Sequence, residues 1–554
     1  MILTIIPLAL AALAVRLVPQ SPLLERTSTL LRNRWAPLLA GASSSFIVAW
    51  VLGSLHPVAG VHDEAAYLLQ ARIFATFHWY APARPIPRFF EQFHVFVTPV
   101  LAAKYPPGQS LLMVPGIWLG MPALVPVILA GVTGAFVYLL ALRLSNEWIA
   151  LLTWMLWTTS RGVLRFLPTY LSQTTTCALW VVGWWALLRW RDTTQRRWLI
   201  VLAVCVGWGT ITHPYTWILF AIPTGVTVAV IAGRRQLWGD LKAGIFVGVA
   251  CLAILGVESR KITGSAFRVP WTVYAQTYFP MDGFGFRTSD AQPLRELSPD
   301  MKIWGDRLRA FHDQYTLRSL PNQLARRLVI IAGDAWGLGR WLLALFALLG
   351  VAFASTEVLF ALVSCVIVIG GFLLFAFYPG WSAYYVQLQP VFAYLTALGL
   401  WRAYSLVKNP RLRLGYMSPA VTSPSVALGM LIVAVLIAPQ LVESVLWGRD
   451  YQLDRRREQV SFRSGVSKLP GTQIIVFVRY GPNHNVDRSL VINSPDLAAM
   501  RVWTVHDRGP DDLQLIRLAP KRIPYLFDGF RNSFTRIDTV GLAAPAKSNS
   551  SKGS

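Results

Sequence analysis

Long apolar blocks recur through the first 446 residues of the chain, and most are close to the length of one membrane crossing. A helix needs about 20 apolar residues to span the hydrocarbon layer of a bilayer. The blocks are residues 1–19, 37–55, 122–143, 147–160, 172–189, 198–213, 215–232, 241–257, 338–354, 357–377, 386–401 and 424–446. This pattern predicts an all-α, polytopic membrane domain over residues 1–446, with about 11–13 transmembrane helices.

The composition agrees with a membrane protein. Apolar residues make up 54% of the chain and charged residues only 14%, whereas a soluble domain carries about 25% charged residues. The net charge is +24, from 51 Lys and Arg against 27 Asp and Glu. Much of the arginine lies in short loops between apolar blocks, as the positive-inside rule predicts, so we do not expect nucleic acid as a partner.

Basic clusters in these loops give an orientation. The clusters are Arg26, Arg32 and Arg34; Arg189, Arg191, Arg196 and Arg197; Arg234 and Arg235; and Arg402, Lys408, Arg411 and Arg413. With all four in the cytoplasm, residues 56–121 and 258–337 and the chain from 447 onward fall on the outer face. The apolar segment 109–121 is too short to cross and is expected to be re-entrant or interfacial.

The chain changes character after residue 446. The run Ile474–Tyr480 is rich in β-branched and aromatic residues and predicts a strand. Further strands are expected at 490–492 and 501–505, and residues 511–518 and 522–528 complete a small α/β pattern. We therefore predict a small extracytoplasmic α/β domain over residues 447–542. The small polar residues of 543–554 predict a disordered tail.

Two adjacent acids, Asp63 and Glu64, follow the second apolar block. Carboxylates close to lipid are costly unless they are needed. Neighbouring residues point in different directions on any regular element, so one acid could act as a base while a cation holds the other. Alternatively, both acids complement the dipole of a helix N-terminus. The following residues, 65–77, form an amphipathic pattern that predicts a helix along the membrane surface.

A second motif is Lys104-Tyr105-Pro106-Pro107-Gly108. The two prolines fix the backbone and exclude a continuous helix, which holds Lys104 at the start of a short apolar segment. A cation at head-group depth suits a lipid phosphate. A lysine that merely extends its ammonium group toward water is the alternative.

Other polar and aromatic residues on the predicted outer face are candidates for substrate contacts. Arg161 and Arg165 could neutralise a phosphate, and His213 ends a crossing. Trp381, Tyr384 and Tyr385 could stack on a sugar or belong to an interfacial aromatic belt. A divalent metal ion is possible if His56, His62 and His94 join Asp63 or Glu64, but their spacing matches no known metal motif, so the metal ligands stay unknown.

The two motifs and the stretch Phe377–Pro390 resemble those of bacterial GT-C glycosyltransferases of the protein-mannosyltransferase-like and aminoarabinose-transferase-like superfamily. The resemblance covers most of residues 37–400. It implies a polyprenyl-phosphate-linked sugar as donor and an active face outside the bacterial inner membrane. It further implies that Asp63, with Glu64 beside it, is the catalytic base and that Lys104 binds the donor phosphate. Tyr67 and Tyr105, inside the two motifs, are candidate substrate-binding residues.

Two other classes of protein stay open. A secondary transporter or lipid flippase would show repeated halves and ionisable residues in mid-membrane, whereas here the polar residues concentrate in loops. A non-catalytic envelope scaffold would make the acidic pair dispensable. The sugar and the acceptor cannot be read from the sequence.

Overall fold

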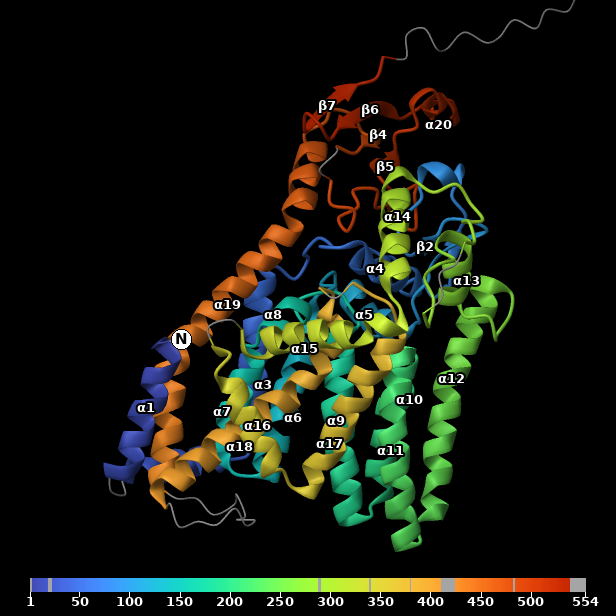
Figure 1. Cartoon of the computed structure of the whole chain (residues 1–554). Coiled ribbons are helices and arrows are strands. Elements are labelled where there is room, and N and C mark those ends of the chain that lie inside the picture. The colour runs from blue at the N-terminus through green and yellow to red at the C-terminus, as the bar shows by residue number, and fades with distance from the viewer. Residues whose placement is uncertain are drawn as a thin grey trace, which may run out of the picture.

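Long helices packed side by side form the larger part of the molecule, and a small sheet stands beyond one end of them (Figure 1). The computed structural model describes residues 2–17, 22–286, 290–337, 340–378, 380–409, 424–481 and 484–538. The tail 543–554, predicted to be disordered, lies outside the described residues. This architecture confirms the predicted all-α membrane domain with a small C-terminal region that contains strands.

The helices are α1 (Ile2–Leu17), α2 (Pro22–Arg32), α3 (Ala36–Leu52), α4 (His62–Phe74), α5 (Gly108–Trp118), α6 (Leu124–Leu144), α7 (Glu147–Thr158), α8 (Arg161–Phe166), α9 (Gln173–Thr193), α10 (Arg196–Thr210), α11 (Pro214–Arg235), α12 (Leu241–Thr263), α13 (Pro270–Tyr278), α14 (Pro299–Gln314), α15 (Leu320–Trp336), α16 (Leu343–Ala352), α17 (Thr356–Gly371), α18 (Gln389–Lys408), α19 (Pro424–Ser467) and α20 (Asp512–Leu518). The strands are β1 (Ala81–Pro82), β2 (Val95–Phe96), β3 (Val100–Ala103), β4 (Ile474–Arg479), β5 (Val502–His506), β6 (Ile523–Asp528) and β7 (Ser533–Arg536).

Within the described residues, 5 helices are long and apolar enough to cross a membrane, or up to 6 if the bent pair α2–α3 counts as one span. The five helical spans are Leu124–Leu144, Pro214–Arg235, Trp238–Thr263, Thr356–Leu374 and Pro424–Ser467. Other apolar helices are shorter, such as α7 with 12 residues and α10 with 15. The chain is thus a multi-pass membrane protein, and the number of 11–13 crossings stays a prediction.

Small residues allow the membrane helices to pack closely. Gly131 of α6 faces α3, and a Cβ atom there would lie 2.2 Å from Ser45 Oγ and 3.0 Å from Gly41 O. Only glycine fits such an approach. Membrane helices associate through close packing of this kind, because lipid supplies no hydrophobic drive between them.

The first loop, residues 53–107, folds over the end of the helices. Its strands form an antiparallel sheet of order β1-β3-β2, with Val95 opposite Ala103. An apolar cluster joins this sheet to the loop 258–337, through Phe93 and Phe96 on one side and Tyr274, Phe279 and Met301 on the other. The two loops that were predicted to share one face therefore pack together.

The C-terminal sheet has the order β5-β4-β6-β7, in which β4 runs parallel to β5 and β6. The strands predicted at 474–480 and 501–505 are confirmed, with small shifts of their ends, and residues 511–518 and 522–528 supply a helix and a strand of the predicted α/β pattern. Residues 490–492 form no strand, and β7 was not predicted. Helix α19 continues unbroken from Pro424 to Ser467, so a helix joins this region to the membrane domain. The domain boundary near 446 stays a prediction.

The C-terminal region also packs on the first loop. Phe89 and Phe90 share an apolar cluster with Ile475, Phe477 and Val505. Figure 1 shows α4, α13, α14 and the C-terminal strands beyond the same end of the helix bundle. All three segments that were assigned to the outer face thus meet at one end of the molecule.

Candidate active site

The first turn of α4 holds the predicted acidic pair and separates the two acids. Val61 enters the helix in an extended conformation, and His62 N donates to Asp487 O over 3.0 Å. Successive residues on a helix are rotated by about 100°. Asp63 consequently keeps 22% of its side chain exposed, whereas Glu64 is fully buried with 0%.

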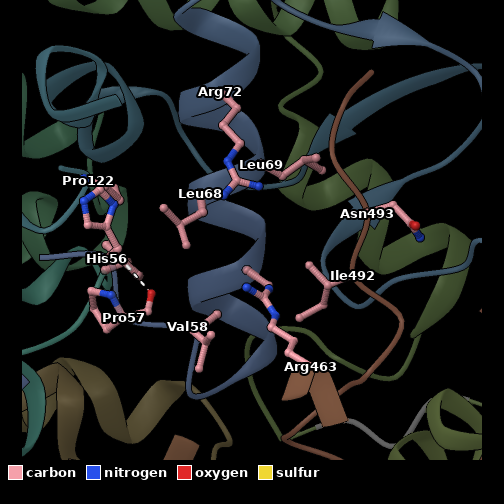
Figure 2. Close-up of a pocket in the computed structure, with 13 residues that line it drawn as sticks. His56, Pro57, Val58, Leu68, Leu69, Arg72, Pro122, Arg463, Ile492 and Asn493 are labelled. Carbon is pink, nitrogen blue, oxygen red and sulfur yellow. Dashed lines mark hydrogen bonds between the residues drawn. The ribbon is translucent and has the colours of Figure 1, made fainter. Parts of the chain in front are cut away.

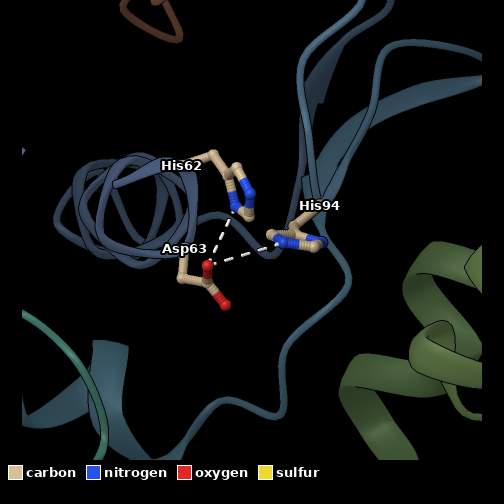
Figure 3. A group of neighbouring side chains, drawn as sticks. All are labelled: His62, Asp63 and His94. Carbon is tan, nitrogen blue, oxygen red and sulfur yellow. Dashed lines mark ion pairs between the residues drawn. The ribbon is translucent and has the colours of Figure 1, made fainter. Parts of the chain in front are cut away.

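Asp63 lies at the centre of a polar cluster drawn from two elements (Figure 3). Its Oδ2 atom is 2.9 Å from His62 Nδ1 and 3.6 Å from His94 Nε2. The Tyr105 hydroxyl donates a short hydrogen bond to Oδ1. His94 comes from the loop before β2, and its backbone N–H donates to the Tyr274 hydroxyl of α13 over 2.8 Å, which holds this part of the loop in place.

The cluster fixes the charge of each member. Burial opposes ionisation of Asp63, but the neighbouring rings of His94 and His62 lower its pKa well below the usual value. Burial likewise opposes protonation of His62, but the carboxylates of Asp63 and Asp487 raise its pKa to about 9. Burial and the nearby Lys104 ammonium lower the pKa of His94 to about 3. At neutral pH, the cluster therefore holds an ionised Asp63, a protonated His62 and a neutral His94.

Lys104 follows β3 and lies beside this cluster. Its backbone nitrogen donates to His94 O over 2.9 Å, and its Nζ atom is 5.4 Å from the Tyr105 ring and 5.2 Å from the Tyr274 ring. Burial lowers the pKa of Lys104, while Asp282 and Asp63 oppose that shift. Among the described residues, the ammonium forms no ion pair with a carboxylate. A buried cation without a direct partner is costly unless a ligand supplies the negative charge.

The diproline motif fixes Lys104 through a close backbone contact. Gly108 N donates to Ile211 O over 2.8 Å, and a Cβ atom at Gly108 would lie 2.3 Å from Thr212 Oγ1. Only glycine fits at this position. The sequence Pro106-Pro107-Gly108 thus anchors the start of α5 against the end of α10 and sets the position of the residues before it.

Glu64 has a different environment from Asp63. Its Oε1 atom is 3.2 Å from Arg455 Nη2, and its Oε2 atom accepts from Tyr170 N over 3.2 Å. The neighbouring Arg456 donates to the backbone oxygens of Val58 and Pro168. Glu64 therefore contacts α19 and the loop after α8, and its role as a second catalytic acid stays a prediction.

Some of the predicted substrate-binding residues surround Asp63. The Tyr67 and Tyr105 rings stack at 4.4 Å. Burial first, and then the nearby Asp63 carboxylate, raise the pKa of Tyr384. Its ring lies 5.5 Å from that of His213, whose pKa falls to about 4 because the imidazole is buried. Tyr67, Tyr105, Tyr384 and His213 thus gather at this end of the bundle.

The other predicted residues bind different partners. The Arg161 guanidinium lies 5.0 Å from the Trp447 ring. Arg165 donates to the Tyr451 hydroxyl over 3.0 Å and to Gly380 O over 3.2 Å. Trp381 packs 5.7 Å from Phe166, and Tyr385 lies 3.4 Å from Arg327. These contacts bind α8 and the 380–385 segment to α15 and α19, and phosphate or sugar binding by these four residues stays a prediction.

Three residues of the site could not be expected from the sequence. Tyr274 and Asp282 lie in the long loop 258–337, and Asp487 lies in the C-terminal region, 3.7 Å from His62 Nε2. None belongs to a recognisable motif. Long-range packing alone brings them to α4.

The cluster also has the composition of a metal site. One ligand atom each of His62, Asp63 and His94 lies within 4.8 Å of the others. Two imidazoles and a carboxylate are a ligand set that suits zinc or a similar divalent transition metal, with a further position open for substrate. His56 lies outside this cluster.

Comparison with known proteins matches one segment of the chain to a family model. Residues 119–257, from just before α6 into α12, match the family model of dolichyl-phosphate-mannose-protein mannosyltransferases. No curated protein matches the chain in sequence.

One solved structure shares the overall fold, and two further matches are weaker. ArnT from Cupriavidus metallidurans, bound to undecaprenyl phosphate, superposes with a TM-score of 0.51 at 14% identity, over 89% of this chain and 90% of that one. Its apo state gives 0.48 at 14% identity, over 88% of both chains. The oligosaccharyltransferase AglB from Archaeoglobus fulgidus gives 0.39 at 14% identity, over 75% of this chain and 56% of that one. Residues 119–257 thus match the family model of protein mannosyltransferases, and the chain as a whole has a fold like that of ArnT, in agreement with the resemblance that its motifs carry.

Proposed function

We propose that the protein is a membrane glycosyltransferase that moves a sugar from a polyprenyl-phosphate carrier to an acceptor hydroxyl. The reaction takes place at the end of the bundle that holds Asp63. The charge pattern assigns this end to the outer face, and the family resemblance implies that the membrane is a bacterial inner membrane. One observation carries the proposal, namely an ionised and partly exposed carboxylate beside a buried ammonium group without an ion-pair partner among the described residues. The fold shared with ArnT, solved with undecaprenyl phosphate, supports the lipid donor.

The two groups suit the two halves of the reaction. A phosphate-linked sugar already carries its leaving group, and Lys104 offsets the negative charge that grows on the departing phosphate. Asp63 accepts the proton of the attacking hydroxyl. Because glycosyl transfer passes through an oxocarbenium-like transition state, the hydroxyl loses its proton late, and a weakly basic carboxylate suffices. A single displacement of this kind inverts the anomeric centre.

Removing the basicity of Asp63 tests this role. We expect Asp63→Asn to lower transfer about a hundredfold or more, because a positioned general base contributes 10²–10⁴-fold. The assay is transfer from a synthetic short-chain polyprenyl-phosphate sugar by the full-length protein in detergent, with the melting temperature measured for each variant. Asp306→Asn, on the exposed side of α14, makes the same chemical change away from the site. Full transfer by a folded Asp63→Asn protein would remove Asp63 from the role of base, and no transfer by the unchanged protein would return the chain to the transporter or scaffold classes.

A metal-dependent form of the same activity is the second candidate, because the three ligand atoms of His62, Asp63 and His94 converge. The separations of 2.9 and 3.6 Å from Asp63 Oδ2 are close to those between ligands of a tetrahedral ion. A bound divalent ion would supply positive charge to the donor phosphate. His62 would have to lose its proton to bind it, so metal affinity rises with pH.

Metal content and chelation decide between the two forms. For the metal-dependent form, we expect purified protein to hold about one ion per chain by elemental analysis, and His94→Ala to remove it. Chelation should then lower transfer, and zinc or manganese should restore it. A chelated, metal-free protein with unchanged transfer would leave Asp63 acting without a metal.

A further inference from the structure

Two adjoining cavities lie on the face of α4 that points away from Asp63. With about 100° between successive residues, Leu68, Leu69 and Arg72 face opposite to Asp63 and Tyr67. One cavity has a volume of about 200 Å³ and the other about 330 Å³. Arg72, Arg463, Ile492 and Asn493 line both of them. We call this pair of cavities the α4 groove.

Two arginines face each other across the groove. Figure 2 shows the guanidinium groups of Arg72, from α4, and Arg463, from α19, pointing toward one another. In the part of the chain that the structure describes, neither guanidinium forms an ion pair with a carboxylate. Two turns earlier on α19, Arg455 does pair with Glu64 at 3.2 Å. Like charges held together without a counter-ion repel, and an anion between them would remove that repulsion.

The remaining walls of the groove are apolar on both sides of the arginines. Leu68, Leu69 and Val58 line the smaller cavity. Phe462, Val466, Leu490 and Val502 line the larger one. A charged centre flanked by apolar walls fits a ligand that carries an anionic group next to apolar parts.

The groove lies at the level where membrane helices end. Pro57 and Val58 follow α3, and Pro122 precedes the membrane span of α6, so the smaller cavity borders the ends of two membrane-embedded helices. Phe77, after the end of α4, and Trp118, the last residue of α5, are 84% and 58% exposed, and their rings lie 5.7 Å apart. Exposed tryptophan is typical of the membrane interface, and basic residues there attract anionic head groups.

We propose that the α4 groove binds the phosphate of a membrane lipid head group, between Arg72 and Arg463. The apolar parts of the lipid lie along Leu68, Leu69 and Ile492. This site is separate from the candidate donor site, because Arg72 lies on the face of α4 opposite to Asp63, and Lys104 lies on the side of Asp63. It does not depend on the proposed transfer activity.

Lipid retention by the full-length protein tests the proposal. The protein is placed in phosphatidylcholine nanodiscs that contain phosphatidic acid, and bound phosphatidic acid is measured by native mass spectrometry. All variants are made in a Lys104→Gln background, which removes the other candidate phosphate contact. We expect the double change Arg72→Gln with Arg463→Gln to weaken binding at least about tenfold, since each charge-assisted contact contributes on that order. The double change to lysine should keep most of the affinity.

Two controls make the result decisive. Arg457→Gln removes the same charge from α19 at a side chain that is 78% exposed, and it should leave binding unchanged. Inorganic phosphate, added as the soluble source of the same group, should not displace the lipid at millimolar concentration. Equal retention in the glutamine double variant, equal loss in Arg457→Gln, or displacement by inorganic phosphate would each overturn the lipid site. Melting temperatures exclude unfolded variants from the comparison.

Discussion

The two ends of the helix bundle differ in whether their basic side chains form ion pairs with carboxylates. At the end with the predicted cytoplasmic loops, Arg32 pairs with Glu147 at 2.9 Å and Arg143 pairs with Glu357 at 2.7 Å. At the other end, Lys104 has no carboxylate within ion-pair distance among the described residues. A cation with a carboxylate from another helix stabilises packing, whereas a buried cation without one is prepared for a ligand. The two ends thus differ in where the counter-charge of a basic side chain lies.

Glu64 and Arg455 form a buried ion pair although they lie at the end that holds the candidate site. Breaking a buried ion pair by removing one partner costs about 3–5 kcal/mol, because an uncompensated charge stays behind. We expect Glu64→Met to produce the largest loss of stability, seen as a lower melting temperature of the purified protein and lower expression. The double variant Glu64→Met with Arg455→Met removes both charges and should recover much of that loss. A double variant as unstable as the single one would show that the pair is not the cause.

The contrast between Asp63 and Glu64 shows which parts of the site could be predicted from the sequence alone. Each acid and Lys104 lie in short motifs, and the restrictions on Pro106 and Pro107 act locally, so their placement near one site could be predicted. The helical region and the strands at β4, β5 and β6 follow from apolar periodicity and β-branched residues in the same way. Local patterns predicted these elements because they depend on neighbours in the chain.

The partners of the acids could not be predicted, because they come from distant segments. Arg455 is 391 residues after Glu64, as the numbering shows, and Asp487 and Tyr274 meet the site only after the loops pack together. No spacing rule links His62 to His94, since the loop between them has no regular period. The same limit applies to Arg161 and Arg165. Their partners Trp447 and Tyr451 lie in the distant helix α19, so these contacts could not be predicted from the sequence.

After the loss of stability at Glu64, the next largest effect is expected at Lys104, on binding of the lipid donor. We expect Lys104→Gln to weaken binding of a polyprenyl-phosphate sugar by about 10- to 100-fold, because a hydrogen bond to a charged group contributes about 1.5–3 kcal/mol. Equilibrium binding of a fluorescent short-chain donor measures this directly. Lys302→Gln, on the surface of α14, provides the matched loss of charge. Equal donor affinity in the folded Lys104→Gln protein would mean that the lysine only packs against Tyr105 and Tyr274.

The ion pairs at the opposite end should matter least. Arg143 is 18% exposed and Glu357 26%, so water screens their attraction, and Arg191 lies close enough to Glu357 to replace part of it. Ion pairs that water can reach contribute about 0–1 kcal/mol. Arg143→Gln should therefore shift the melting temperature by only a few degrees and leave donor binding and transfer at the level of the unchanged protein. The measurement pairs a thermal scan with the transfer assay on the same preparation. A loss of transfer without a loss of stability would show that charge at this end also acts on the site, and the distinction between the two ends would no longer hold.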